Sequence, residues 1–302
     1  MPHASIEAVH NAVVGTTAPQ MFLKLAAARP DLPALHSMRS DAPGSWNVWT
    51  LHDYVDATAK AAAGLQVVGL GPNERILLMV RNRPEFHWFD LAAQFLRATP
   101  VSIYNSSSAE EVQYLAEHAE ARIAIIEDIG FLERLLSVRD QLPVLEQIYV
   151  IDPPSNGCPV GVQPASVLMD KGSADLAALA TLIEPDDIAT LIYTSGTTGP
   201  PKGVIITHYN VVYTVEALRQ CFGLDSFAGR RVVSYLPMAH IAERMMSHYQ
   251  AIILGYSVFC CPDANQLSSY LKEVHPEIVF GVPRVWEKIY NGVNAALASD
   301  PA

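Results

Sequence analysis

The sequence is poor in cysteine and lacks the spacing typical of a metal site. Its four cysteines show no CxxC pattern, and the adjacent pair, Cys260 and Cys261, lies in an apolar stretch where burial is expected. The ten histidines show no HExxH pattern. We therefore predict no zinc site. From the cysteine pattern we infer a reducing cytoplasm.

Basic charge is also scarce. The chain has 20 Lys and Arg against 31 Asp and Glu, which gives a net charge of −11, and no strong run of basic residues occurs. Nucleic-acid binding depends on clustered positive charge that neutralises phosphates. The composition therefore argues against a nucleic-acid partner.

Long apolar runs and a targeting signal are missing as well. The longest apolar stretch, residues 251–261, is shorter than the ~20 residues that a membrane-spanning helix needs. The first twenty residues have neither a basic start nor a long apolar core. We predict no transmembrane segment, which leaves peripheral membrane contact open.

What the sequence does have is ample material for a core. Half of its 302 residues are hydrophobic and 17% are charged. The length suggests about two domains or one large unit. Apolar strand patterns alternate with helical ones, which predicts an α/β fold whose parallel sheets are covered by helices.

The expected helices and strands follow from the periodicity of hydrophobic residues and from helix-capping residues. Thr50 and Pro84 mark two helix starts, and Ser108 with Glu111 forms a capping box for a third. Pro, Gly and Asn are frequent over 153–164, which predicts a surface loop. Strands are expected at 75–80, 123–126, 147–151, 188–193, 203–207, 232–236, 257–261 and 278–282, and later helices at 209–221, 241–254, 267–274 and from 285.

The most informative segment is YTSGTTGPPKG at 193–203. Glycine allows backbone N–H groups to turn inward, and a concave set of such donors binds anions. Hydroxyls and a lysine supply further donors and a positive charge. The segment predicts a polyphosphate-binding loop between two strands, formed by Thr194, Ser195, Gly196, Thr197, Thr198, Gly199 and Lys202.

Two other interpretations of this loop are weaker. A Walker A loop would read GxxxxGK[ST] and open a helix, whereas no GK[ST] occurs here and Pro200 and Pro201 precede the lysine. An ordinary hairpin turn does not need four hydroxyls, three glycines and a lysine in one short segment.

At this point the sequence resembles the adenylate-forming enzymes, which include acyl-CoA synthetases and luciferases. YTSGTTGPPKG is similar to their phosphate-binding signature. YLPMAHIAER at 235–244 and GVPRVWEK at 281–288 resemble segments of the long-chain fatty acyl-CoA synthetase branch. The likeness runs from about residue 20 to the end of the chain.

The resemblance implies an acid–thiol ligase. ATP would activate a fatty acid to an acyl-adenylate, and coenzyme A would then take the acyl group. Thr194 would also ligate Mg²⁺. His240 would be the catalytic histidine near the carboxylate and the α-phosphate, the alternative being a packing histidine. Glu243 and Arg244 would lie in the acyl-adenylate vicinity and orient His240, or they would form a plain surface ion pair.

The resemblance covers only the amino-terminal half of such an enzyme. No GxTE or TGD segment follows Trp286, and the C-terminal domain has no counterpart. We expect a first subdomain at 1–170 and a second, truncated one at 171–302 that carries the phosphate loop. The alternative is an inactive nucleotide- or lipid-binding module, or one half of a split enzyme. Such a half would associate with a complementary C-terminal half or with another copy of itself.

Overall fold

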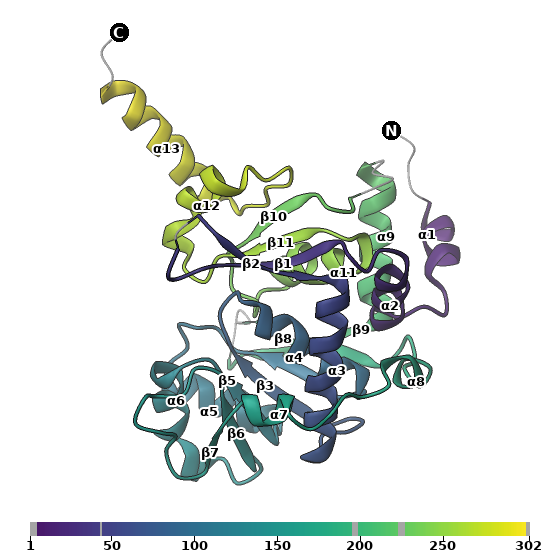
Figure 1. Ribbon diagram of the computed structural model, residues 1–302, viewed down its shortest axis with the longest axis vertical. Coiled ribbons are helices and arrows are strands. Elements are labelled where there is room, and N and C mark those ends of the chain that lie inside the picture. Colours follow the sequence, from purple (N-terminus) through teal and green to yellow (C-terminus); the bar gives the residue numbers. More distant parts are fainter. Residues whose placement is uncertain (1–4, 43, 195–198, 223–226, 300–302) are drawn as a thin grey trace.

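The computed structural model describes residues 5–42, 44–194, 199–222 and 227–299 (Figure 1). The predicted loop residues Ser195, Gly196, Thr197 and Thr198 lie outside these residues. Two sheets dominate the architecture, and the elements between and around them form alternating layers.

The larger sheet has seven strands in the order β7-β6-β5-β3-β4-β8-β9. Neighbouring strands pair in parallel except β8 and β9, which form an antiparallel hairpin at one edge. The strands are β3 (Arg75–Met79), β4 (Thr99–Ser102), β5 (Ile123–Ile126), β6 (Gln147–Val150), β7 (Val162–Pro164), β8 (Ile188–Thr194) and β9 (Lys202–Thr207).

The smaller sheet has four strands in the order β10-β11-β1-β2. Strands β10, β11 and β1 are parallel, and β2 pairs antiparallel with β1. These strands are β1 (Pro33–Met38), β2 (Trp46–Thr50), β10 (Arg231–Ser234) and β11 (Ser257–Cys260). Each sheet thus combines early and late parts of the chain.

Helices cover both sheets. The amino-terminal ones are α1 (Ile6–Val13), α2 (Ala18–Ala28), α3 (Leu51–Val67), α4 (Pro84–Phe95), α5 (Ala109–His118) and α6 (Ile129–Leu136). The later ones are α7 (Ser166–Met169), α8 (Leu176–Ala180), α9 (His208–Phe222), α10 (Ile241–Glu243), α11 (Gln250–Leu254), α12 (Leu267–Val274) and α13 (Pro283–Ser299). A π-helical segment, Arg244–Tyr249, joins α10 to α11, and short 3₁₀ turns lie at Arg139–Gln141 and Ala264–Gln266.

The central strand β3 shows how the layers are held together. Ile76 and Leu78 pack into the core that contains α3 and α4, whereas Leu77 and Met79 pack into the core on the opposite face, with α5 and α6. Successive strand residues point to opposite faces, so a continuous apolar run serves a sheet that is buried on both sides. The core around α3 and α4 also includes residues of β1 and β11, which places these helices between the two sheets.

Local signals in the sequence set the helix starts correctly. Thr50 and Asp53 form a capping box at α3, Ser108 and Glu111 form another at α5, and Pro84 occupies the first turn of α4. The predicted strands and helices of the central part are confirmed within one or two residues. The sequence therefore predicted the α/β class correctly, because capping and periodicity act over only a few residues.

Two expectations were wrong, and the elements before residue 51 were not predicted. Residues 278–282 form no strand, and only an isolated bridge joins Ile278 to Val232. The expected loop 153–164 ends in β7, which pairs with β6. The structure also has elements before residue 51 that the periodicity analysis did not assign, namely α1, α2, β1 and β2.

The sheets do not divide the chain at residue 170. Strands β8 and β9 complete the larger sheet, which otherwise comes from the first segment, and β1 and β2 join the sheet of the later β10 and β11. A division into 1–170 and 171–302 therefore stays a prediction about subdomains and does not describe the sheets.

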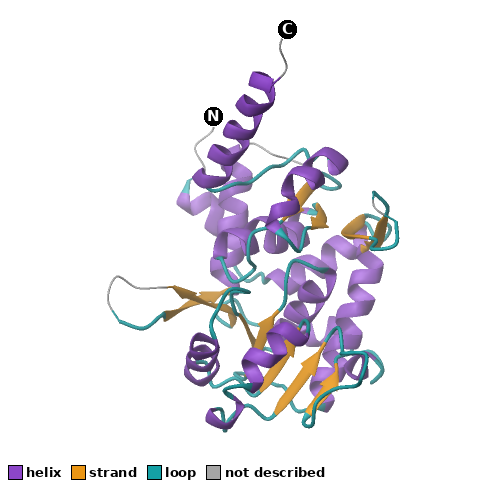
Figure 2. Cartoon of the chain, turned by 90° about the vertical axis from the view of Figure 1, so that its left-hand side faces the viewer, coloured by secondary structure: helices purple, strands orange, loops and turns teal. Residues whose placement is uncertain are grey.

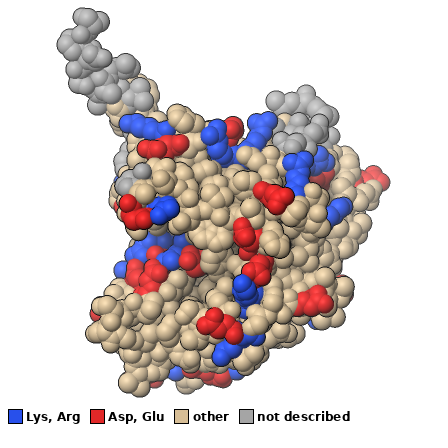
Figure 3. Space-filling model, in the orientation of Figure 1, with Lys and Arg blue, Asp and Glu red and all other residues tan. Residues whose placement is uncertain are grey.

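Among the described residues, no helix combines the length and apolar character that crossing a bilayer requires. Figure 3 shows acidic and basic side chains interspersed over one face, without a continuous basic area. Cys260 and Cys261 are buried as expected, and burial raises the pKa of both thiols, to about 12 for Cys261.

Candidate nucleotide-binding site

The predicted phosphate loop lies at the end of the β8–β9 hairpin. Tyr193 pairs with Gly203, and Thr194 with Lys202, so the loop joins two antiparallel strands as expected. In Figure 2 the two strands extend away from the rest of the chain. Thr194 and Lys202 are both exposed. These two side chains are therefore accessible to a ligand.

Gly199 takes a backbone conformation that favours glycine. Its φ is +82°, in the left-handed region, and among the described residues beyond its chain neighbours no atom lies within 4 Å of a Cβ built there. The backbone conformation alone therefore favours glycine at this position. The motif thus places a left-handed residue just before the strand that begins with Lys202.

A pocket of about 610 Å³ opens beside the hairpin. Thr194 and Pro201 line it from the hairpin, and His240 and Ile241 line it from the second motif. The remaining lining residues come mostly from α5 and the segment before it: Tyr104, Ser106, Ser107, Glu110, Glu111, Tyr114, Leu115, Ile192 and Tyr193. Two motifs that are distant in the sequence therefore border one cavity.

His240 lies at the start of a helix and faces this pocket. Its side chain is exposed, and its Nδ1 accepts a hydrogen bond from the backbone N–H of Ala242 at 3.1 Å. Because Nδ1 is an acceptor, the neutral ring carries its proton on Nε2. The ring can therefore donate a hydrogen bond from Nε2. Its exposure does not fit the alternative of a packing histidine.

Glu243 lies in the interior, away from the lining of the pocket. Its carboxylate accepts hydrogen bonds from the hydroxyls of Ser234 at 2.8 Å and Ser247 at 2.7 Å, and from the N–H of Leu236 at 3.2 Å. Burial raises the pKa of Glu243 to about 7, although these hydrogen bonds act in the opposite direction.

Arg244 is also fully buried and forms an ion pair with Asp90 on α4. It donates to the hydroxyl of Ser102 at 2.6 Å, and Asp90 accepts a further bond from Nε2 of His248 at 3.0 Å. His248 in turn contacts His87, with 3.0 Å between their Nδ1 atoms. Burial lowers the pKa of both histidines. We call Asp90, Arg244, His248 and His87 the buried cluster.

The alternative of a surface ion pair between Glu243 and Arg244 is therefore wrong. Neighbouring residues of a helix point in different directions, and here each side chain enters the interior toward a different set of partners. Neither lines the pocket. Their placement near an acyl-adenylate stays a prediction, as does the catalytic role of His240.

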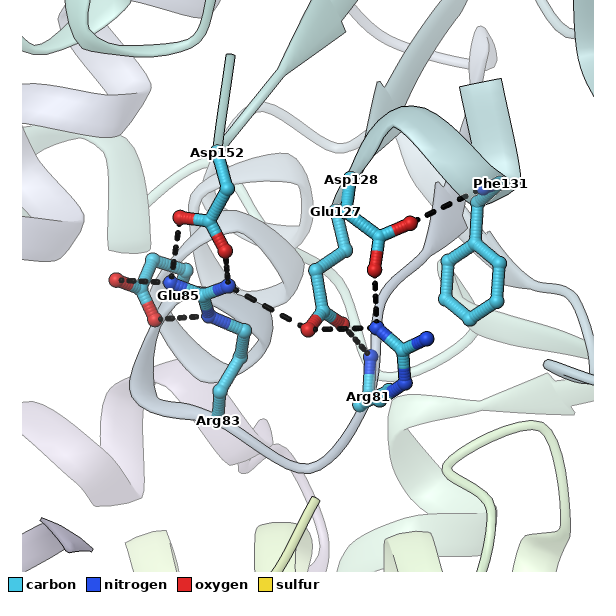
Figure 4. A network of polar contacts seen from close by, with 7 residues as sticks. All are labelled: Arg81, Arg83, Glu85, Glu127, Asp128, Phe131 and Asp152. Atoms are coloured by element: carbon cyan, nitrogen blue, oxygen red, sulfur yellow. Dashed lines mark hydrogen bonds and ion pairs between the residues drawn. The ribbon is translucent and has the colours of Figure 1, made fainter. Parts of the chain in front are cut away.

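A second polar cluster lies where β3, β5 and β6 end (Figure 4). Arg81 contacts Glu127 at 3.0 Å and Asp128 at 2.6 Å. Arg83 contacts Glu85 at 2.8 Å and Asp152 at 2.5 Å. The carboxylates neutralise both guanidinium groups, so this cluster does not favour an anionic phosphate.

Asn82, between these two arginines, links the sheets. Its side-chain amide donates to the hydroxyl of Ser234 at 2.8 Å and to the carbonyl of Leu236 at 2.9 Å. Ser234 also contacts Glu243. A hydrogen-bonded path thus runs from the end of β3 to the helix that begins after His240.

Over the residues that the structure describes, no group of three or more His, Cys, Asp or Glu is arranged to hold a metal ion.

Sequence reasoning missed the α5 wall of the pocket. The capping box at Ser108 located the helix but carried no information about its neighbour in space. Tyr114 on this helix donates to the carbonyl of Pro201 at 2.8 Å, across 87 positions of sequence. Only the arrangement of α5 beside the hairpin shows this contact.

Comparisons with known proteins identify the family of the chain. Residues 22–301 match the AMP-binding enzyme family. The chain is 32% identical over 289 residues to the long-chain-fatty-acid–CoA ligase ACSBG2 of Xenopus laevis, covering 91% of this chain and 38% of the relative. It is 33% identical to human ACSBG2 over 287 residues, covering 92% of this chain and 42% of the relative.

Solved structures show the same fold. A long-chain-fatty-acid–CoA ligase (FadD1) from Archaeoglobus fulgidus has a TM-score of 0.79 at 22% identity, covering 94% of this chain and 55% of that one. The anthranilate CoA ligase AuaEII, in complex with anthranoyl-AMP, has a TM-score of 0.77 at 21% identity. The match covers 90% of this chain and 51% of that one. The chain spans about two-fifths of the length of the curated relatives it matches. With the family match over most of its length, the chain belongs to the AMP-binding enzyme family.

Proposed function

We propose that this chain carries the phosphate-binding part of a long-chain fatty acid–CoA ligase. ATP would bind with its β- and γ-phosphates at the hairpin loop. A fatty carboxylate would attack the α-phosphorus and release pyrophosphate, and the thiol of coenzyme A would then attack the acyl carbon and release AMP. The observation that carries the proposal is that both family motifs, through Thr194 and His240, border one pocket.

The described side chains suit charge stabilisation at such a site. Lys202 is an exposed ammonium group at the start of β9, where it can accompany the departing pyrophosphate. Nε2 of His240 can donate to a phosphate or carboxylate oxygen without carrying a full charge. Catalysis of phosphoryl chemistry depends mainly on such positioning and on stabilising developing negative charge.

The residues present fit Mg²⁺ in one specific manner. Mg²⁺ keeps several waters and is held by few protein ligands together with phosphate oxygens. Thr194 offers one accessible hydroxyl at the pocket, which Glu110 and Glu111 also line, and among the described residues no group of three or more His, Cys, Asp or Glu is arranged to hold a metal ion. Thr194 would therefore hold a phosphate-bound Mg²⁺, which would neutralise charge on the triphosphate.

The decisive test is fatty-acid-dependent exchange of labelled pyrophosphate into ATP by the full chain, together with calorimetric titration of pyrophosphate. Lys202→Ala is expected to weaken pyrophosphate binding about tenfold, because one charge-assisted contact is lost. Lys24→Ala, which removes an exposed lysine on α2, is the matched control and should bind as wild type.

The outcomes separate the candidate functions. Exchange by the wild-type chain supports the ligase. Pyrophosphate binding that depends on Lys202 but comes without exchange supports a nucleotide-binding module or one half of a split enzyme. If Lys202→Ala leaves binding unchanged, the loop is not the phosphate site.

A further inference from the structure

Helix α5 passes beside the loop end of the hairpin and bonds to Tyr193 of β8 and to Pro201, the residue before β9. Tyr114 and His118 lie four residues apart, so they share one face of the helix. The hydroxyl of Tyr114 donates to the carbonyl of Pro201 at 2.8 Å. Nδ1 of His118 lies 2.8 Å from the hydroxyl of Tyr193. One helix face therefore reaches both sides of the hairpin.

These two contacts lie where the paired part of the β8–β9 hairpin ends and the loop begins. Tyr193 is followed by the last paired residue of β8, Thr194, whose partner is Lys202. Pro201 directly precedes Lys202. The bonds to α5 thus hold the chain on both sides of the loop, at Tyr193 of β8 and at Pro201 just before β9.

Gly203 has a role in the same arrangement. A Cβ atom at this position would lie 3.3 Å from Cζ and 3.5 Å from the hydroxyl of Tyr193. The phenol ring therefore lies across the strand at the residue that pairs with Tyr193. A side chain at position 203 would press on the group that bonds to His118.

Tyr193 on β8 is packed in a hydrophobic core, whereas among the described residues the β9 side of the hairpin has little other support near the loop. Strand β9 is the edge of the sheet, with β8 as its neighbour. Lys202, Val204 and Ile205 are exposed. Edge strands with few buried contacts open at low free-energy cost, so individual side-chain bonds matter more there than in a packed core.

We propose that Tyr114 and His118 are positioning residues that fix the base of the phosphate loop, and through it set the affinity of the chain for a polyphosphate tail. They act through the hairpin and not by touching the ligand. The proposal rests on the proposed function for its ligand. Its structural part, the stabilisation of the hairpin by α5, does not depend on any ligand.

The test uses Tyr114→Phe, which removes one hydroxyl and keeps the ring. Tyr209→Phe is the matched control, because the Tyr209 hydroxyl bonds to Nδ1 of His10 at 3.0 Å, between α9 and α1. Amide hydrogen exchange is followed on peptides that cover 188–194 and 199–207, without ligand. Titration of inorganic pyrophosphate and of ATP with Mg²⁺ gives the affinities.

We expect Tyr114→Phe to speed exchange at the base of the hairpin about two- to tenfold and to weaken pyrophosphate binding by a similar factor. Tyr209→Phe should change neither. His118→Leu should act like Tyr114→Phe. His118→Asn keeps a polar atom near the place of Nδ1, so its increase in exchange and its loss of pyrophosphate affinity should both be smaller. A purely structural role would lower the melting temperature without this local pattern.

Unchanged exchange at 188–194 and 199–207 in Tyr114→Phe and His118→Leu overturns the proposal, whatever the ligand data show. Faster exchange with unchanged pyrophosphate affinity overturns its ligand part. If the wild-type chain binds neither pyrophosphate nor ATP while the exchange effect is present, the proposed function fails and the positioning of the hairpin by α5 stands.

Discussion

The β8–β9 hairpin and the helical segment after His240 border the same pocket, but they are held in different ways. Val204 and Ile205 on β9 are 43% and 58% exposed, and the strand has one neighbour in the sheet. Arg244 and His248, in contrast, have 0% exposed side chains and bond to Asp90 on another helix.

The difference shows how one pocket combines an adaptable wall and a fixed one. Buried ion pairs and hydrogen bonds restrict a segment to few arrangements, since a lost bond leaves an unpaired group in a medium of low dielectric. A hairpin at a sheet edge has fewer such constraints. His240 is thus carried by a rigid segment, and Lys202 by one that side chains of α5 must stabilise. The π-helical segment adds an irregular turn of a kind often found near functional sites.

The largest effect should come from breaking the buried cluster. Arg244→Met removes the partner of Asp90 and leaves a buried carboxylate uncompensated, which should lower the free energy of unfolding by about 3–5 kcal/mol. Urea denaturation followed by circular dichroism measures this. The exposed pair of Arg39 and Asp41 gives the control, because Arg39→Met should cost less than about 1 kcal/mol.

The double variant Asp90→Asn with Arg244→Met sharpens this comparison. Because it removes both charges, it should recover part of the stability lost in Arg244→Met alone. Asp90→Asn alone gives the reference. If the losses in free energy of unfolding of the two single variants simply add in the double variant, the ion pair does not determine the stability of this wall.

The next effect depends on pH and arises from Glu243. Its pKa is about 7 in the folded state against an ordinary value of 4.5, so between these pH values the folded state keeps a proton that the unfolded state has released. The contribution of Glu243 to the free energy of unfolding is therefore largest below pH 4.5. It falls by about 3 kcal/mol as the pH rises to 7. Unfolding of wild type and Glu243→Gln is compared from pH 4.5 to 8, and the variant should gain relative stability as pH rises.

Glu277 provides a control, because the fold shifts its pKa in the opposite direction from that of Glu243. Hydrogen bonds from Arg231 lower the pKa of Glu277 to about 2, so its contribution is lost only as pH falls from 4.5 toward 2. Glu277→Gln should therefore differ from wild type by a constant amount between pH 5 and 8. A constant difference for Glu243→Gln over the same range would show that Glu243 is ionised in the fold throughout.

A smaller effect is expected on the hairpin. Gly199→Val forces a branched residue into a left-handed conformation at φ +82°, at a cost of about 1–3 kcal/mol. Among the described residues no atom beyond the chain neighbours lies within 4 Å of a Cβ at this position, so the effect expected here is that of backbone strain. Thermal unfolding measures it, and Gly199→Asn, which tolerates this conformation better, should cost less. Equal losses for Val and Asn would argue against strain.

The smallest effect on stability belongs to Lys202→Ala. The side chain is exposed, so the free energy of unfolding should stay within about 0.5 kcal/mol of wild type while pyrophosphate binding falls. Chemical denaturation and ligand titration on the same preparation test this separation. A stability loss comparable to that of Arg244→Met would mean that the hairpin is held as firmly as the helical wall.

Several features of the site could be predicted from the sequence because they are local. The strand–loop–strand order at 188–207, the left-handed residue at Gly199 and the helix after His240 all depend on neighbouring residues. Capping at Thr50 and Ser108 works over three positions. Such interactions are visible in a short window of sequence.

Other features depended on partners far along the chain. Whether Glu243 and Arg244 lay on the surface or in the interior could not be read from their spacing, because the partner of Arg244 is 154 positions away. Strand β7 has three residues and takes its structure from pairing with β6. The same holds for the α5 wall, whose contact with Pro201 no local pattern encodes.

The sequence by itself thus determined the α/β class, the positions of most central elements and the chemical character of the loop, since propensity, capping and glycine conformation act within one turn or strand. The tertiary structure alone decided which charges are buried, which sheet each strand joins and which helix supports the hairpin. These depend on burial and on long-range pairing, where the free energy comes from residues that only the folded chain brings together.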